Sequence, residues 1–168
     1  MKYTRFLLFM LVLIAAGCKS KRDSTSTENP RPKKRKILTG VTITSIGITQ
    51  FPKFAGDGEK WDAYAPFATD PDLFLVLKWN ENIVYKSETR NDCHFGTPVA
   101  FSQSLPVEVK MFDQPLLLEI YDEDGVSSND NVGYFNLLLK DFEGQKEFDL
   151  TKGELILRLT VDWIYASK

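Results

Sequence analysis

Apolar and polar residues alternate along most of the chain after residue 38, most regularly near its C-terminal end. One parity there carries apolar side chains, at Leu155, Leu157, Leu159, Val161 and Trp163. The other parity is mostly polar, at Glu154, Ile156, Arg158, Thr160 and Asp162. Successive side chains of a β-strand point to opposite faces of a sheet, so the pattern predicts a strand with one buried face.

Similar short runs recur through the same part of the chain, separated by Gly, Pro, Asn or Asp. They cover residues 41–50, 73–79, 82–90, 105–111, 115–122, 132–139, 146–150 and 154–164. Eight short strands with turn residues between them predict an all-β fold, an eight-stranded antiparallel β-sandwich. No segment of this region has sustained helical periodicity, so we expect helices to be short or absent.

The first run changes phase in its middle. Val41 and Ile43 have one parity, whereas Ile46 and Ile48 have the other. One extra residue in a strand, a β-bulge, would return all four side chains to the same face. We therefore predict a bulge near Ser45.

The N-terminal residues have the layout of a secretory signal peptide. Lys2 and Arg5 precede an apolar stretch from Phe6 to Ala16, which is shorter than the roughly 20 residues that a membrane-spanning helix needs. Residues 14–18 (IAAGC) resemble a bacterial lipobox, in which the cysteine is acylated after cleavage, although Ala15 stands where leucine is usual. We expect residues 1–18 to be a lipoprotein signal peptide and Cys18 to carry lipid. The alternative is an ordinary cleaved signal with an incidental cysteine.

The next segment, residues 19–37, reads as a basic disordered linker. It holds eight Lys or Arg against two Asp or Glu and almost no apolar side chains. Its run of basic residues 33–36 either attracts anionic lipid headgroups or is a solvated spacer. Lys19 stands where an aspartate would retain a Gram-negative lipoprotein at the inner membrane. We therefore expect a lipid-anchored protein of the cell envelope, at the outer membrane of a Gram-negative bacterium.

The remaining residues, 38–168, have the length of a single domain and the opposite charge. They contain 21 Asp or Glu against eleven Lys or Arg, a net charge of −10. Such a surface repels nucleic acid phosphates, so nucleic acid is not an expected partner. Export implies an oxidising compartment, yet an acylated Cys18 leaves only Cys93, so no intramolecular disulfide is expected.

An apolar run ends in a group of carboxylates. Residues 116–122 place Asp122 on the parity of the apolar side chains, and Asp124 and Asp130 follow within eight residues. Three like charges on one loop repel each other unless they protonate or bind a cation. Calcium prefers several hard oxygen ligands and suits an aspartate cluster, whereas zinc or copper would require more His and Cys than this domain has.

These residues resemble a known family. The pattern Asp-x-Asp-x5-Asp-x-apolar-Gly, ending at Val132 and Gly133, is similar to loop three of C2 domains, the calcium- and phospholipid-binding β-sandwiches. Residues 71–77 (PDLFLVL) resemble the family's strand two, residues 97–99 its Asn-Pro-Val turn, and residues 148–150 with 153–155 its last two strands. The resemblance covers about residues 41–164.

The resemblance implies a calcium site shared between two loops. Asp122, Asp124 and Asp130 would be ligands from loop three, with Ser127 as a supporting oxygen. Asp72 would be the ligand from loop one, replaced by Asp70 if the register slides by two residues. A second loop-one ligand is implied where this chain has Tyr64. Asp62 is the nearest aspartate, with Asp57 behind it. Many C2-type domains keep the fold without calcium, and that alternative stays open.

Four apolar residues near this rim are candidates for membrane insertion: Trp61, Tyr64, Phe67 and Val126. They would equally serve to cover the end of the core. No nucleophile motif is evident: Cys93 and His94 are sequence neighbours, which point to opposite faces on a strand. No small-molecule substrate is suggested.

We therefore expect a non-enzymatic module that binds anionic membrane lipids through calcium. The alternatives are a calcium-independent interaction or assembly domain that binds an envelope protein and, more remotely, a hydrolase that uses the acidic rim.

Overall fold

The computed structural model describes residues 36–56, 58, 61, 70–124 and 128–167. Residues 34–168 form a compact unit with its own core. Its elements are β1 (Lys36–Gln50), β2 (Leu73–Trp79), β3 (Asn82–Lys86), β4 (Val99–Phe101), β5 (Val107–Val109), β6 (Leu116–Asp122), β7 (Asp130–Leu137), the 3-10 turn η1 (Leu139–Phe142), β8 (Glu147–Lys152) and β9 (Leu155–Ser167). Among the described residues, no helix is long and apolar enough to cross a membrane.

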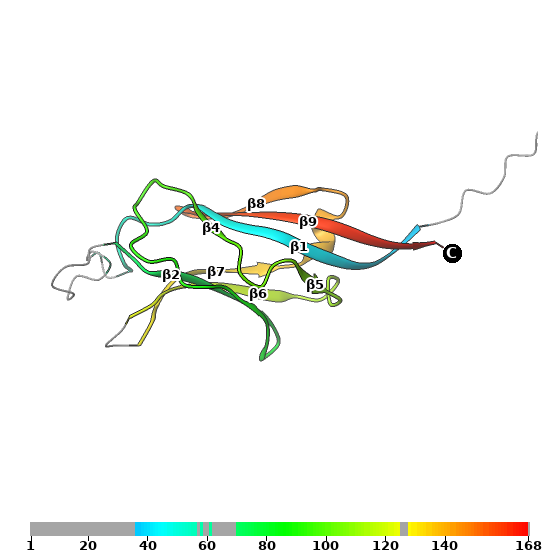
Figure 1. Cartoon of the computed structure of the whole chain (residues 1–168), viewed down its shortest axis with the longest axis horizontal. Coiled ribbons are helices and arrows are strands. Elements are labelled where there is room, and N and C mark those ends of the chain that lie inside the picture. The colour runs from blue at the N-terminus through cyan, green and yellow to red at the C-terminus, as the bar shows by residue number, and fades with distance from the viewer. Residues whose placement is uncertain (1–35, 57, 59–60, 62–69, 125–127, 168) are drawn as a thin grey trace, which may run out of the picture. The chain divides into compact units, whose positions relative to one another are not determined.

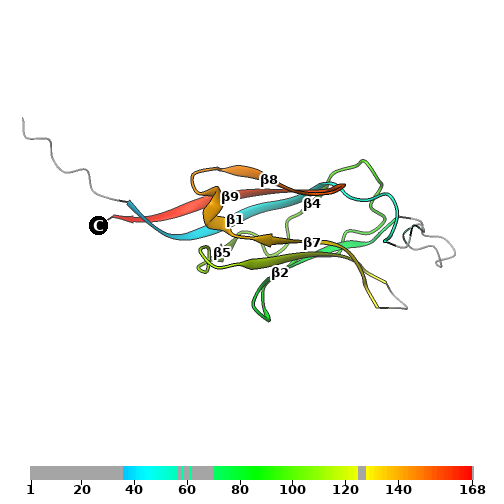
Figure 2. The ribbon, with the colours of Figure 1, turned by 180° about the vertical axis from the view of Figure 1, so that it is seen from behind.

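The strands form two antiparallel sheets that lie face to face (Figure 1). One sheet has the order β3-β2-β6-β7, and the other has the order β4-β1-β9-β8. The short strand β5 also pairs with β1, at Val41–Ile43, whereas β4 pairs with Ile46–Ile48. Because β9 runs along the other edge of β1, β4 and β5 share one edge position. If β4 and β5 are counted as one edge position, the two sheets contain eight strand positions, which confirms the predicted eight-stranded sandwich. Figure 2 shows the same two sheets from behind.

Several bounds differ from the sequence prediction. The strand β1 begins at Lys36, inside the segment expected to be linker, because its first residues pair with the end of β9. The strand β3 ends at Lys86, short of the predicted residue 90. The strand β4 lies where the sequence predicted only a turn. It is three residues long, and its middle residue, Ala100, is exposed. The expected strand over residues 105–111 is reduced to Val107–Val109. Both are short edge segments, in which alternation has too few residues to be recognised.

The two inward faces form one hydrophobic core. Its central members include Val41, Ile43, Ile46 and Ile48 of β1, Leu73, Leu75 and Leu77 of β2, Leu118 and Ile120 of β6, and Leu157, Leu159 and Val161 of β9, all with 0% exposure. Both sheets and their core lie between residues 36 and 167, so we expect the fragment 34–168 to fold without the preceding residues.

The strand β1 contains the predicted bulge and two more. Its register with β9 shifts at Leu38/Gly40, Ile43/Ser45 and Ile48/Gln50. The residue inside each shift is a threonine, and its hydroxyl donates to a carbonyl of β9: Thr39 to Ile164, Thr44 to Thr160 and Thr49 to Ile156, at 3.1–3.2 Å. The bulges allow apolar residues of both parities to face the core.

The strand β1 runs the length of the sandwich, from the end where the described chain starts to the end that carries the loops. Lys36 pairs with Ser167 where the two long strands β1 and β9 begin and end (Figure 1). Residues 51–72 are here called loop one, residues 90–98 loop two and residues 122–130 loop three. The described residues of all three loops lie at the opposite end (Figure 1).

Candidate functional site

Three aspartates stand in register at the loop end of the sheet β2-β6-β7. Asp122, the last residue of β6, pairs with Leu73 on one side and with Asp130 on the other. Asp72 immediately precedes Leu73. Pairing between neighbouring strands therefore aligns Asp72, Asp122 and Asp130 across the sheet, although Asp72 lies 50 positions before Asp122 in the sequence.

Asp122 is buried, with 1% of its surface exposed, and fastens loop one to loop three. Its Oδ1 accepts a 2.7 Å hydrogen bond from the backbone N–H of Asp72. In return, the carbonyl of Asp72 accepts a 2.7 Å hydrogen bond from the N–H of Glu123. A buried carboxylate with a backbone donor is a strong, charge-assisted contact. The two loops are thus held in a defined relation.

Asp72 also reaches loop two. Its Oδ1 accepts a 2.7 Å hydrogen bond from the N–H of Asp92. The neighbouring N–H of Cys93 donates to the carbonyl of Pro71 at 2.9 Å. Asp72 therefore contacts both loop two and loop three.

The other predicted aspartates of loop three are more accessible. Asp124 is half-buried and Asp130 is exposed. The N–H of Asp124 donates to Oδ1 of Asn129 at 3.2 Å, which links the residues after β6 to those before β7. The side-chain oxygen of Asn129 belongs to this loop but was not among the ligands predicted from the sequence. The position of Asn129 next to Asp130 could have indicated it.

Several predicted residues cannot be placed in the site. Asp57, Asp62, Tyr64, Phe67, Val126 and Ser127 lie outside the described residues, as does Cys18. Asp70, the alternative loop-one ligand, lies half-buried beside loop two, where it pairs with Nδ1 of His94. Asp70 thus has a partner already, whereas Asp72 belongs to the network around Asp122.

The donor set at this end suits calcium in its chemistry. Asp72, Asp122, Asp124 and Asp130 all present hard carboxylate oxygens, the ligand type that calcium prefers. Within the described ranges, no three His, Cys, Asp or Glu side chains gather closely enough to hold a metal ion. Two members of the expected ligand set, Asp62 and Ser127, are outside those ranges, so the described residues represent only part of the set.

A hollow lies between loop one and β7. Ala55, Gly56, Trp61, Asp130 and Asn131 line an open space of about 510 Å³. Trp61 is 4% exposed, and its Nε1 donates to the carbonyl of Pro52 at 2.9 Å. Trp61 is thus a buried side chain at this end of the sandwich, and its insertion into a membrane stays a prediction.

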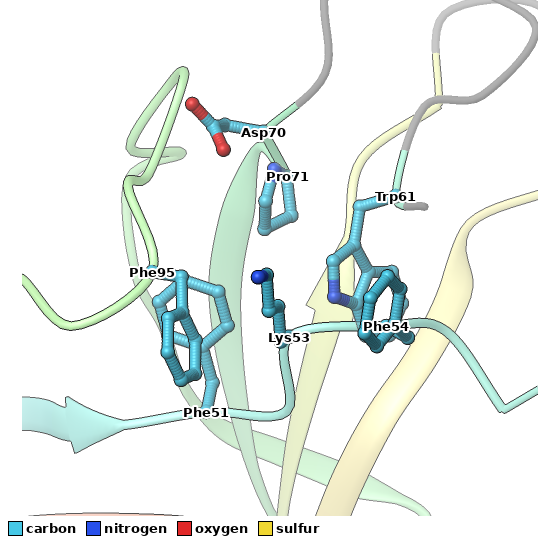
Figure 3. Close-up of a pocket in the computed structure, with 7 residues that line it drawn as sticks. All are labelled: Phe51, Lys53, Phe54, Trp61, Asp70, Pro71 and Phe95. Carbon is cyan, nitrogen blue, oxygen red and sulfur yellow. The ribbon is translucent and has the colours of Figure 1, made fainter. Parts of the chain in front are cut away.

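A second pocket lies between loop one and loop two and was not expected from the sequence. Its volume, including space open to solvent, is about 490 Å³, and its lining residues are Phe51, Lys53, Phe54, Trp61, Asp70, Pro71 and Phe95 (Figure 3). The aromatic residues come from segments about 40 positions apart, which explains why no local pattern shows the pocket. The only local signal was Phe51 and Phe54 on either side of Lys53.

Cys93 and His94 have separate partners. The Cys93 side chain is buried, its Sγ donates to the carbonyl of Arg90 at 2.9 Å, and burial raises the pKa of its thiol. His94 is exposed and contacts Asp70. A raised pKa lowers the thiolate fraction and thus the reactivity of the thiol.

Comparison with known proteins agrees with this architecture. The family model of the C2 domain matches residues 54–152, so this chain belongs to the C2 domain family. C2 domains are modules that bind phospholipid membranes or proteins, and many of them depend on calcium. A comparison with curated proteins gives no match.

The solved structures to which this chain is similar are distant in sequence. The structure named BON1-C2B is 18% identical, with a TM-score of 0.46, over 78% of this chain and 93% of that one. A C2 domain of plant extended synaptotagmin 1 is 19% identical, with a TM-score of 0.43, over 79% and 98%. Human GIVD cytosolic phospholipase A2 is 16% identical, with a TM-score of 0.49, over 79% of this chain but only 18% of the enzyme.

Proposed function

We propose that this protein is a calcium-dependent module that binds anionic phospholipid membranes through loops one and three. One observation carries the proposal: sheet pairing and the Asp72–Asp122 hydrogen bond align Asp72, Asp122 and Asp130 at the loop end of the sandwich. Negative charge concentrated there repels anionic lipids. Bound calcium would offset that repulsion.

Asp72, Asp122, Asp124 and Asp130 would hold the ion, with Asp62 and Ser127 added by resemblance to the family. Calcium accepts six to eight oxygen ligands, so carboxylates on one side leave positions for lipid phosphate oxygens on the other. Bound calcium thus supplies a positive bridge between protein and membrane. The role of Asp122 is to keep loops one and three together, since its Oδ1 already accepts the N–H of Asp72.

The proposed setting is the cell envelope of a Gram-negative bacterium. Acylated Cys18 would anchor the protein at the outer membrane, with the basic segment before β1 as a tether. In this setting the domain binds a surface and has no catalytic role. The described domain begins at Lys36, at the end of the sandwich away from the loops, so the loops are not crowded by the attachment point (Figure 1).

Thermal unfolding of the fragment 34–168, with and without millimolar calcium, tests the metal. A ligand present at 100 times its dissociation constant adds about 2.7 kcal/mol to the free energy of unfolding, which is a clear rise in melting temperature. Asp124→Asn should remove most of that rise, because it takes away one charged ligand. Asp113→Asn, an exposed aspartate in the turn before β6, is the matched control and should leave the rise intact.

Sedimentation with vesicles then tests the membrane. Calcium should bring the fragment down with phosphatidylcholine vesicles that contain phosphatidylglycerol, and the Asp124→Asn variant should remain in solution. An unchanged melting temperature with calcium would contradict the metal site. A calcium-dependent rise without vesicle binding would instead favour a protein-interaction or assembly role.

A further inference from the structure

An ammonium group lies among aromatic rings in the pocket between loops one and two. The side chain of Lys53 rises between Phe51 and Phe95 on one side and Phe54 and Trp61 on the other (Figure 3). Its Nζ lies 5.6 Å from the centroid of the Phe54 ring. The pocket therefore combines one positive charge with largely apolar walls.

The charge of Lys53 has no carboxylate partner among the residues that the structure describes. Asp70 lines the same pocket, above Lys53 in Figure 3, but its carboxylate pairs with His94 of loop two. The one carboxylate among the described residues that line the pocket is thus paired with loop two. No described carboxylate neutralises Lys53, which stands at an end of the domain that is otherwise rich in aspartate.

The rims of the pocket are exposed aromatic side chains. Phe54 is 47% exposed and Phe95 is 49% exposed. Phe95 is held edge-to-face against buried Phe51, with ring centroids 6.3 Å apart and planes at 84°. Two exposed rings that flank a cation suit a boundary between water and hydrocarbon, where aromatic side chains are favoured.

We propose that this pocket is a second lipid contact, in which Lys53 binds the phosphate of an anionic phospholipid headgroup while Phe54 and Phe95 enter the membrane interface. This contact needs no calcium, because the lysine itself supplies the positive charge. The inference rests on the proposed membrane function and adds a headgroup subsite to it. It also gives loop two a role, whereas the aspartate site uses loops one and three.

Binding of the fragment 34–168 to vesicles in the presence of a calcium chelator tests the pocket. The vesicles are phosphatidylcholine with and without phosphatidylglycerol. One lysine near an anionic surface contributes about a fivefold gain in affinity, so Lys53→Gln should weaken the chelator-resistant binding about fivefold. Phe95→Ser should weaken binding further, since it removes an exposed ring from the interface.

Matched controls separate the pocket from general charge and hydrophobicity. Lys110→Gln removes an exposed lysine at the end of β5, far from the loops, and Ile83→Ser removes a 61% exposed apolar side chain of β3. Neither variant should change vesicle binding by more than the scatter of the wild type. Melting curves of all four variants should stay cooperative, because every altered side chain is on the surface.

The fluorescence of Trp61 distinguishes a membrane from a soluble anion. Brominated phosphatidylglycerol vesicles should quench the emission of the fragment, and Trp61→Phe should remove most of that quenching. Inorganic phosphate alone should leave the emission unchanged. An equal response to inorganic phosphate would overturn the commitment to a membrane, and equal losses for Lys53→Gln and Lys110→Gln would overturn the pocket.

The two proposals fail in different ways. If calcium adds nothing but Lys53→Gln still weakens binding in chelator, the calcium function is wrong and the pocket stands. If calcium drives binding that Asp124→Asn abolishes, while no binding remains in chelator, the pocket is wrong and the calcium site stands.

Discussion

The backbone N–H of Asp72 donates a 2.7 Å hydrogen bond to Oδ1 of Asp122, across 50 positions of sequence. The contact joins the start of β2 to the end of β6, the two strands whose loops carry the candidate calcium ligands. The side chain of Asp122 thus has a structural role that is present without any metal. Asp124, which follows two residues later, has no such bond to loop one among the contacts described.

This difference predicts a separation between stability and calcium binding. In calcium-free buffer Asp122→Ala should lower the free energy of unfolding by about 2 kcal/mol, because a hydrogen bond to a charged group is lost. Asp122→Asn should lose less, since its amide oxygen still accepts the N–H of Asp72. Urea denaturation of the fragment 34–168 measures both values.

The control for this prediction is Asp113→Ala, which should change the free energy of unfolding by no more than about 0.5 kcal/mol. Asp113 is exposed in a turn away from the loops. Equal losses for Asp113→Ala and Asp122→Ala would show that the hydrogen bond contributes no particular stability.

Gly133 is required by packing against Leu155. A Cβ at Gly133 would lie 2.6 Å from Cδ2 of Leu155, a buried side chain of β9 with 2% exposure. Gly133→Ala should therefore destabilise the domain by about 1 to 3 kcal/mol, the usual cost of overpacking a core. Gly56→Ala is the matched control, because a Cβ there meets nothing within 4 Å. A stability for Gly133→Ala equal to that of the control would mean that Leu155 moves aside freely.

Glu88 should make part of the stability sensitive to acid. Partial burial by itself raises the pKa of its carboxyl. The N–H groups of Ser102 and Gln103, which donate hydrogen bonds at 3.0 and 3.2 Å, lower that pKa by more than burial raises it. The net pKa therefore lies below the ordinary value. A folded-state pKa below the unfolded value contributes stability above the unfolded pKa. That stability is lost as pH falls through the lowered folded pKa.

The measurement is the melting temperature of wild type and Glu88→Gln as the pH falls from about 5 to about 3, across the ordinary glutamate pKa. Wild type should be more stable than Glu88→Gln at the upper end, and the difference should shrink toward the lower end. Glu154→Gln, an exposed glutamate in the turn between β8 and β9, should track the wild type. A constant difference for Glu88→Gln over this range would contradict the assignment.

Much of the sandwich followed from local patterns. Alternation in residues 154–163 predicted a strand of this kind, because one buried face is enough to set the period. The phase change between Ile43 and Ile46 predicted the bulge that the register shift at Ile43/Ser45 confirms. The sequence did not show that Thr44 fills the bulge by donating to the carbonyl of Thr160, because that bond depends on a strand more than 100 positions away.

The sequence by itself determined the all-β class, the apolar faces and the group Asp122, Asp124 and Asp130, since each depends on neighbours a few residues apart. Only the tertiary structure decided that Asp72 bonds to Asp122, that Asp70 turns to His94, and that Lys53 lies between Phe54 and Phe95. The physical reason is that pairing of β2 with β6, and the meeting of loops one and two, bring together residues whose partners no local pattern can name.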